Sequence, residues 1–176
     1  MGTILVPIIS FFVNQGHYMI GWASAPYDPR WARAYPRRAA LMAAAGPLAN
    51  FALVLVAGLV MAAQLESGAF LPAYEGFGLD RLVVGADGAP TAVTAFFSVL
   101  FSVNLILGTF NLIPLPPLDG NAVVPLFLSP RLQARWEALF EGPGAMLGLV
   151  VAMVIHARFV INPIFGWALG LLYGAR

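Results

Sequence analysis

One segment of this apolar chain combines the residue types that could do chemistry. It reads Asn111-Leu-Ile-Pro-Leu-Pro-Pro-Leu-Asp119-Gly120 and follows an apolar run that ends at Phe110. Each proline removes a backbone donor and clashes with the preceding helical turn, so the segment predicts a broken helix end. A carboxylate at membrane depth is costly and indicates a functional site by default. Asp119 is therefore the first candidate; the alternative is a solvated carboxylate in a loop at the membrane surface.

The two histidines are the other candidate ligands. A catalytic zinc needs three protein ligands and an open position for water, and a helix commonly presents two of them as His-Glu-x-x-His, with the glutamate as general base. Neither His17 nor His156 is followed by glutamate or by a histidine four residues later. We interpret His17 as an interfacial aromatic residue and His156 as a polar partner within a helix bundle, near Arg158.

Composition determines the class of protein that must position these residues. Of 176 residues, 60% are hydrophobic and 10% are charged, whereas soluble domains carry about 25% charged residues. The chain is thus predicted to be an integral membrane protein in contact with the lipid bilayer. A net charge of +1 argues against a nucleic-acid partner, and the absence of cysteine excludes disulfides, thiolate metal sites and cysteine nucleophiles.

The N-terminal part does not contain a spanning helix. Residues 1–13 are apolar but too short to cross a bilayer, which takes about 20 residues, so we expect a membrane half-segment. Residues 14–38 are rich in Trp, Tyr and Arg, which favour the headgroup zone and the cytoplasmic side, and are expected to form an interfacial connector. Alternatively, residues 21–26 form an extended edge to which a peptide strand could add.

The first predicted spanning helix covers residues 39–65. It contains Gly46-Pro47-Leu-Ala-Asn50, which places an amide inside the bilayer. That amide either holds helices together or hydrogen-bonds to a substrate or to active-site backbone.

The rest of the chain completes a single membrane domain over residues 1–176. The arginines before the first helix indicate the cytoplasmic side, which places the broken segment near the inner leaflet. We therefore expect an all-α integral membrane protein with three to four transmembrane helices, the N-terminal half-segment and the proline-broken helix end. The remaining elements are an external loop at 66–90, a transmembrane helix at 91–113, a motif loop with a cytoplasmic connector at 114–142, and a kinked or split transmembrane helix at 143–173.

The Gly-Pro-x-x-Asn segment, followed roughly sixty residues later by Asn-x-x-Pro-x-Pro-x-x-Asp-Gly, resembles the site-2 protease family of intramembrane zinc metalloproteases, in its short bacterial form without a PDZ domain. The match runs in order from about Gly2 to Arg135. The resemblance implies that Asp119 is the third zinc ligand. It also implies a polar contact of Asn111 with substrate or intermediate. The further residues that it assigns to substrate binding or to the shape of the site are Asn50, Pro114, Pro116 and Gly120.

The implied activity is hydrolysis of a peptide bond in a transmembrane segment of a membrane-protein substrate by a zinc-activated water, in a bacterial inner membrane. The chain departs from the family because it has no His-Glu-x-x-His. In the family that helix lies upstream of a segment that commonly reads Asp-Pro-x-Gly-Thr-x-Leu, and this chain begins Met1-Gly-Thr-Ile-Leu5. The resemblance thus implies that Met1 is an internal methionine of a longer parent and that this chain is inactive alone.

Two other functions remain open. The chain could be a non-catalytic pseudoprotease that acts as a membrane binding or scaffold protein. A small channel or transporter subunit is the third interpretation, favoured by His156, Arg158 and the broken helices.

Overall fold

The computed structural model describes residue 12 and residues 28–74, 78–139 and 144–174. The chain divides into two compact units, Met1–Tyr35 and Pro36–Arg176. The expected half-segment 1–13, apart from Phe12, lies outside the described residues, as do His17 and the possible edge at residues 21–26. In the first unit, helix α2 (Pro29–Ala34) begins at an N-cap, Asp28, whose carboxylate accepts a hydrogen bond from the Arg30 backbone N–H at 2.8 Å.

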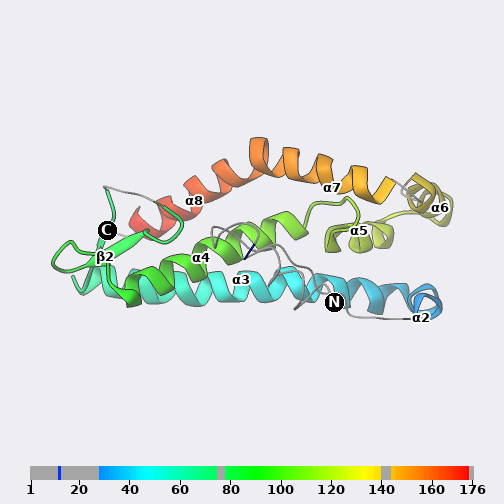
Figure 1. Cartoon of the computed structure of the whole chain (residues 1–176). Helices are drawn as coiled ribbons and strands as arrows, with labels where there is room; N and C mark the ends of the chain where they lie inside the picture. Colours follow the sequence, from blue (N-terminus) through cyan, green and yellow to red (C-terminus); the bar gives the residue numbers. More distant parts are fainter. Residues whose placement is uncertain (1–11, 13–27, 75–77, 140–143, 175–176) are drawn as a thin grey trace. The chain divides into compact units, whose positions relative to one another are not determined.

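The second unit is built from helices with one short antiparallel hairpin (Figure 1). Among the described residues, three helices are long and apolar enough to cross a membrane: Pro36–Glu66, Ala92–Asn111 and Leu147–Gly174. The predicted all-α membrane fold is thereby confirmed. In chain order the elements are α3 (Pro36–Glu66), β1 (Phe70–Pro72), β2 (Val83–Gly85), α4 (Ala92–Asn111), α5 (Asp119–Val123), η1 (Val124–Phe127), α6 (Pro130–Leu139), α7 (Gly144–Ile155), the π-helix η2 (His156–Val160) and α8 (Ile161–Gly174).

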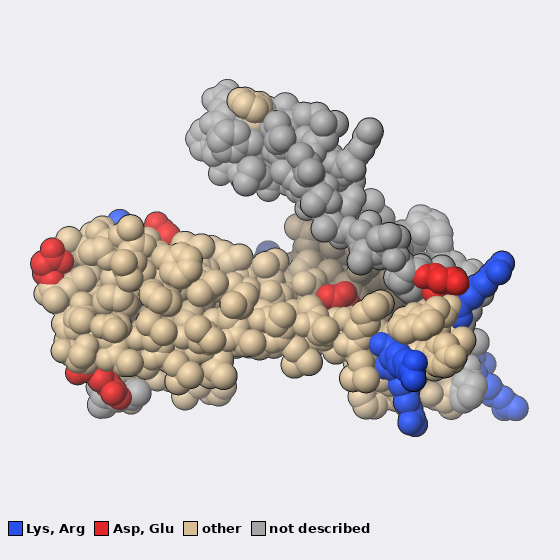
Figure 2. Space-filling model, turned by 90° about the horizontal axis from the view of Figure 1, so that it is seen from below, with Lys and Arg blue, Asp and Glu red and all other residues tan. Residues whose placement is uncertain are grey.

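Charged side chains of this unit lie mainly beyond the ends of the apolar spans. Arg37 and Arg38 are in the first turn of α3, whereas Asp80 and Asp87 follow its other end, in the segment between α3 and α4. Figure 2 shows mostly uncharged surface between these two regions. A bilayer would cover this apolar band, because its hydrocarbon core excludes charge.

Helices α3 and α4 pack closely because glycines face large side chains. A methyl group at Gly108 of α4 would lie 3.2 Å from the Phe51 ring of α3, and one at Gly58 of α3 would lie 3.3 Å from the Phe101 ring of α4. Small residues at such positions allow membrane helices to approach each other. The buried core of the unit extends from this interface to the hairpin and α8.

The hairpin connects α4 with α8 at the end of the unit opposite Arg37. Strand β1 pairs antiparallel with β2, with Phe70 opposite Gly85. The Ser98 hydroxyl of α4 accepts a hydrogen bond from the Leu82 backbone N–H at 3.0 Å, and the Tyr173 hydroxyl of α8 donates to the Leu82 carbonyl at 2.7 Å. The segment expected as a loop at 66–90 therefore contains paired strands that contact two helices.

The third span is one bent helix, whereas its sequence left open a kinked helix or two half-helices. Helix α7 continues through η2 into α8 (Figure 1). Pro163 has no N–H, and its ring crowds the carbonyl of Phe159, the residue four positions earlier. The π-helical hydrogen bonding of His156–Val160 lies directly before this site, and such turns accompany sharp bends.

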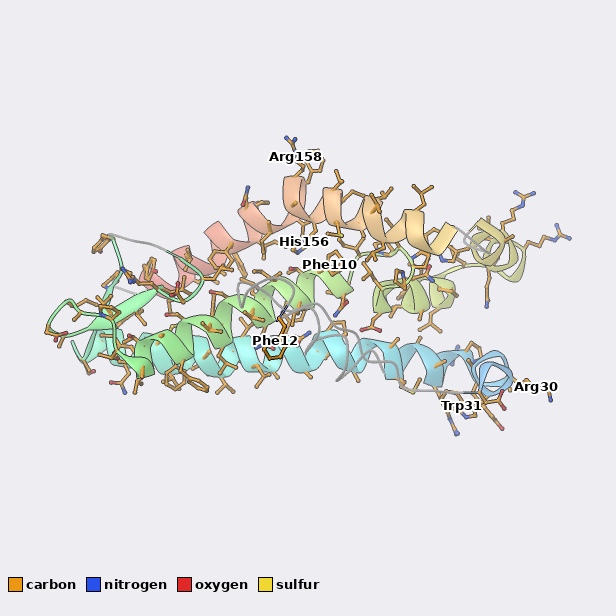
Figure 3. The ribbon with its side chains drawn as sticks, viewed as in Figure 1. Phe12, Arg30, Trp31, Phe110, His156 and Arg158 are labelled. Carbon is orange, nitrogen blue, oxygen red and sulfur yellow. The ribbon has the colours of Figure 1, made fainter. Side chains whose placement is uncertain are left out.

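A buried hydrogen bond joins this third span to α4. His156 is 7% exposed, its Nε2 atom lies 2.9 Å from the Thr109 hydroxyl, and its ring meets that of Phe110 edge-on. Because Thr109 donates its single hydroxyl hydrogen to the Leu105 carbonyl at 2.7 Å, it accepts from His156 Nε2–H. His156 therefore pairs across to α4, while Arg158 points away from α4 (Figure 3).

The third span also packs on the segment between α4 and α5, residues 112–118, which we call the motif loop. A methyl group at Gly148 of α7 would lie 2.5 Å from the Pro116 carbonyl oxygen. Ile113 and Leu118 of the motif loop form a buried cluster with Ala152 of α7. The position of the motif loop thus depends on α7 as well as on α4.

We expect Thr109→Val to lower the free energy of unfolding by about 1–2 kcal/mol. The substitution removes the hydroxyl that accepts from His156, and the buried N–H of His156 is then left without an acceptor. Thr109→Ser keeps the hydroxyl and should lose much less. The measurement is unfolding of the detergent-solubilised chain by heat or SDS. Equal losses in the two variants would contradict the assigned hydrogen bond.

Gly148→Ala should destabilise the protein by about 1–3 kcal/mol, because the added methyl overlaps the motif loop. Gly166→Ala in α8 is the matched control, since its methyl would meet nothing within 4 Å and alanine favours the helix. Both variants are compared in the same unfolding assay. A loss in the control as large as that in Gly148→Ala would refute the packing argument.

Candidate functional site

The motif loop begins where the prolines of the sequence predicted that the helix would end. Helix α4 ends at Asn111, and the loop then turns through hydrogen bonds from Ile113 N–H to the Phe110 carbonyl (3.0 Å) and from Leu118 N–H to the Leu115 carbonyl (3.0 Å). The Pro116–Pro117 peptide is cis. These turns lead the chain into α5, whose first residue is Asp119.

The carboxylate of Asp119 lies against α3. A methyl group at Gly46 would lie 3.0 Å from Asp119 Oδ2. Asp119 is half-buried, and this burial raises the pKa of its carboxyl above the usual value because removal from water disfavours the charged form. The structure therefore brings together the glycine of Gly-Pro-x-x-Asn and the aspartate of the second motif.

Gly120 allows the motif loop to close on itself. It is buried, and a side chain there would overlap the backbone carbonyl oxygens of Leu112 and Ile113. With no side chain, α5 begins directly beneath the end of α4, and Asp119 is held at that point. A larger residue at position 120 would therefore push α5 away from the end of α4.

The other motif residues surround this contact in different ways. Asn50 lies one turn after Gly46 on α3, is half-buried and packs through Cβ against Gly108. Asn111 is half-buried at the last position of α4. Within the described part of the chain, neither amide is hydrogen-bonded to Asp119. Pro116 is buried against α7 and Pro114 is exposed.

An apolar groove of about 1030 Å³ runs between α3, α4 and the third span. Its walls are nearly all apolar side chains, among them Phe51, Leu105 and Trp167. Ile113 and Pro114 of the motif loop also line it, whereas Asp119 does not. The groove therefore extends from the motif loop along the membrane-spanning helices.

One contact of this region was not predicted from the sequence. The indole N–H of Trp136 on α6 donates to Asn121 Oδ1 at 2.7 Å and holds the amphipathic α6 against α5. Trp136 and Asn121 are fifteen residues apart, and nothing in the sequence points to either as the partner of the other.

A zinc site needs more ligands than this region supplies. In the part of the chain that the structure describes, no three His, Cys, Asp or Glu side chains lie close enough together to hold a metal ion. His156 is engaged with Thr109, and His17 lies outside the described residues. Asp119 could donate one carboxylate ligand, but the described residues do not fit a complete catalytic zinc site.

Comparison with known proteins provides the family. The profile of "Peptidase family M50" matches residues 9–155. "Putative zinc metalloprotease YwhC" of Bacillus subtilis (strain 168) is 28% identical over 163 residues, which cover 92% of this chain and 64% of that protein. "Putative zinc metalloprotease Rip3" of Mycobacterium tuberculosis (strain H37Rv) is 34% identical over 95 residues, 53% of this chain and 23% of that protein.

The chain thus spans less than two thirds of the length of these relatives. No solved structure shows significant similarity to it. The family match covers most of the chain and includes both motifs, with Asp119 and Gly46 in contact. This membrane protein belongs to peptidase family M50, the site-2 protease family.

Proposed function

We propose that the protein acts as an intramembrane zinc metalloprotease that cleaves transmembrane segments of membrane-protein substrates, in a bacterial inner membrane. Family membership supports a peptidase, and the relatives YwhC and Rip3 are named zinc metalloproteases. The observation that carries the proposal is the Asp119 carboxylate, which a proline-broken helix end places against Gly46 of a spanning helix.

Asp119 is the residue through which this part of the protein would contribute to the metal site. A zinc ion in such an enzyme lowers the pKa of its bound water and polarises the substrate carbonyl. The remaining ligands and the general base are not among the described residues, so no step of hydrolysis is assigned to them.

The described residues position the carboxylate. The Asp119 side chain would otherwise be free to choose among rotamers. Contact with α3 limits that choice, and the loop backbone is held by Gly120 beneath α4 and by Pro116 against α7. A ligand held in one orientation binds metal without paying the cost of ordering at the moment of binding.

We place the substrate segment in the apolar groove. Its lining by spanning helices suits the side chains of a transmembrane segment, and its end at the motif loop leads toward the region of Asp119. Half-buried Asn111, next to that end, would supply a polar group for an unwound substrate backbone, whose amides need partners inside a bilayer.

Asp119→Asn tests the metal role, because an amide keeps the shape but is a much weaker zinc ligand. In the protein expressed from its genomic locus in its native membrane, we expect cleavage of a transmembrane reporter to fall at least about 100-fold. Even the substitution of residues that only support the zinc ligands lowers metal affinity or activity about 10–100-fold. Zinc content of the purified protein, measured by mass spectrometry, should fall in parallel. Asp80→Asn, in the external segment, is the control and should leave both unchanged.

Full cleavage by Asp119→Asn would show that the ligand assignment is wrong. If the wild-type protein expressed from its genomic locus neither binds zinc nor cleaves any reporter, the non-catalytic binding or scaffold function becomes the better interpretation.

Gly46→Ala tests the contact that orients the carboxylate. The added methyl would meet Oδ2 at 3.0 Å and force Asp119 to move, so we expect weaker zinc binding and a loss of cleavage of about 10–100-fold. Gly58→Ala lies on the same helix and crowds the Phe101 ring instead. It should alter stability without altering zinc affinity; equal effects of the two variants on zinc affinity would argue against the orienting role of Gly46.

A further inference from the structure

Helix α6 (Pro130–Leu139) lies across the membrane-spanning helices rather than along them. Figure 1 shows it nearly end-on, whereas α3 and α4 run across the view. Only residues 140–143 separate it from α7, at the end of the unit where α3 begins. A helix that lies in the plane of a membrane surface has this orientation to the spans.

Contacts among the three spans mark one common level in the molecule. The Cβ atom of Asn50 on α3 would face a methyl group at Gly108 of α4 at 3.3 Å. The next residue of α4, Thr109, is hydrogen-bonded to His156 of the third span. These four residues therefore lie at about the same depth in the bilayer, and distances along each helix can be counted from them.

The starts of α3 and α7 are about equally far from this level. Both helices run from their starts toward the hairpin, which follows α3 and contacts α8. Arg37 is thirteen residues before Asn50, and Gly144 is twelve residues before His156. At about 1.5 Å per residue these separations are roughly 20 Å and 18 Å. The start of α7 thus lies at the level of the arginines in the first turn of α3.

That level coincides with a headgroup layer. Helix α4 runs in the opposite direction, and its first residue, Ala92, is sixteen residues or roughly 24 Å from Gly108. Ala92 and Arg37 are therefore separated by roughly 44 Å along the spans. A bilayer with its headgroups is about 40–45 Å thick. Helix α6, which directly precedes α7, consequently lies in the headgroup layer on the side of Arg37.

The side of α6 turned away from α5 carries two arginines. Trp136 faces α5, because its indole N–H donates to Asn121 Oδ1 at 2.7 Å. At about 100° per residue, Leu132, Arg135 and Arg131 lie roughly 40°, 100° and 140° around the helix from Trp136. All three are exposed. The leucine thus lies between the tryptophan and the two arginines.

Charge and exposure on this side of α6 suit a layer of lipid phosphates. Among the described residues, no carboxylate forms an ion pair with Arg131 or Arg135, and Glu137 lies roughly 200° around the helix from Arg135. Leu132 is 50% exposed, and Phe127 of the preceding η1 is 82% exposed. Arginines beside exposed apolar residues are typical of interfacial helices, whose apolar side chains enter the acyl boundary while guanidinium groups bind phosphate.

We propose that α6 docks on anionic lipids of the leaflet that contains it, which the arginines near the start of α3 predict to be the cytoplasmic one. Arg131 and Arg135 bind lipid phosphates, and Leu132 and Phe127 enter the acyl-chain boundary. This inference does not depend on the proposed protease activity.

The experiment uses the full 176-residue chain in nanodiscs of mixed phosphatidylcholine and phosphatidylglycerol. The chain has no cysteine, so Ser129→Cys, at an exposed position directly before α6, takes a single fluorophore. Brominated acyl chains, which quench the fluorophore, are placed on one lipid or on the other at constant composition. The ratio of the two quenching values gives the preference of the surface for the anionic lipid.

We expect phosphatidylglycerol to be preferred about fivefold for each arginine that binds a phosphate. The double variant Arg131→Gln/Arg135→Gln should bring the preference close to one, whereas the double Lys variant should keep most of it. Arg81→Gln, in the external segment, removes one positive charge elsewhere and should have no effect.

Phe127→Gln tests the apolar part of the surface. It should reduce quenching by both lipids and leave their ratio unchanged, because the fluorophore then lies farther from the acyl chains.

Three results would overturn the proposal. Equal quenching by the two lipids in the wild type would exclude a preference for anionic lipid. A preference that persists in the double Gln variant, or that Arg81→Gln reduces equally, would show that α6 is not its source. An absence of quenching by either lipid would show that protein covers this side of α6.

Discussion

The contact between the Asp119 carboxylate and Gly46 is the constraint on which the rest of the structure depends. A carboxylate beside a spanning helix is energetically costly, and it remains there only if the surrounding backbone fixes its position. Here three separate elements contribute: α4 ends so that the motif loop can turn, α3 has no side chain where the carboxylate lies, and α7 covers the loop through Gly148. Helices α3, α4 and α7 thus together fix the position of the motif loop and of Asp119.

Backbone-driven features of this arrangement could be predicted from the sequence. Prolines 114, 116 and 117 predicted the end of α4, because proline chemistry acts locally and does not depend on tertiary context. The three spans followed from length and apolar composition. The family also followed from the two motifs, and the match over residues 9–155 confirms it.

Contacts between distant residues could not be predicted in the same way. Thr109 and His156 are 47 residues apart, and the sequence around each gives no sign that its side chain hydrogen-bonds to another helix. Gly46 and Gly148 belong to small-residue patterns that many membrane helices share, so the sequence did not reveal that they face Asp119 and Pro116. The role of Asp119 as a zinc ligand and that of Asn111 toward substrate remain predictions.

The π-helical turn at His156–Val160 has a consequence for the register of the third span. Such a turn accommodates about one residue more than a regular α-helical turn. Deleting a single residue there would restore a regular α-helix with little rotation of the residues downstream, so that Tyr173 would still reach the Leu82 carbonyl. A deletion in the regular part of α8 before Tyr173 would instead rotate everything after it by roughly 100° and carry Tyr173 away from that carbonyl. The residues from His156 to Val160 are thus the part of the third span in which the loss of one residue is tolerated.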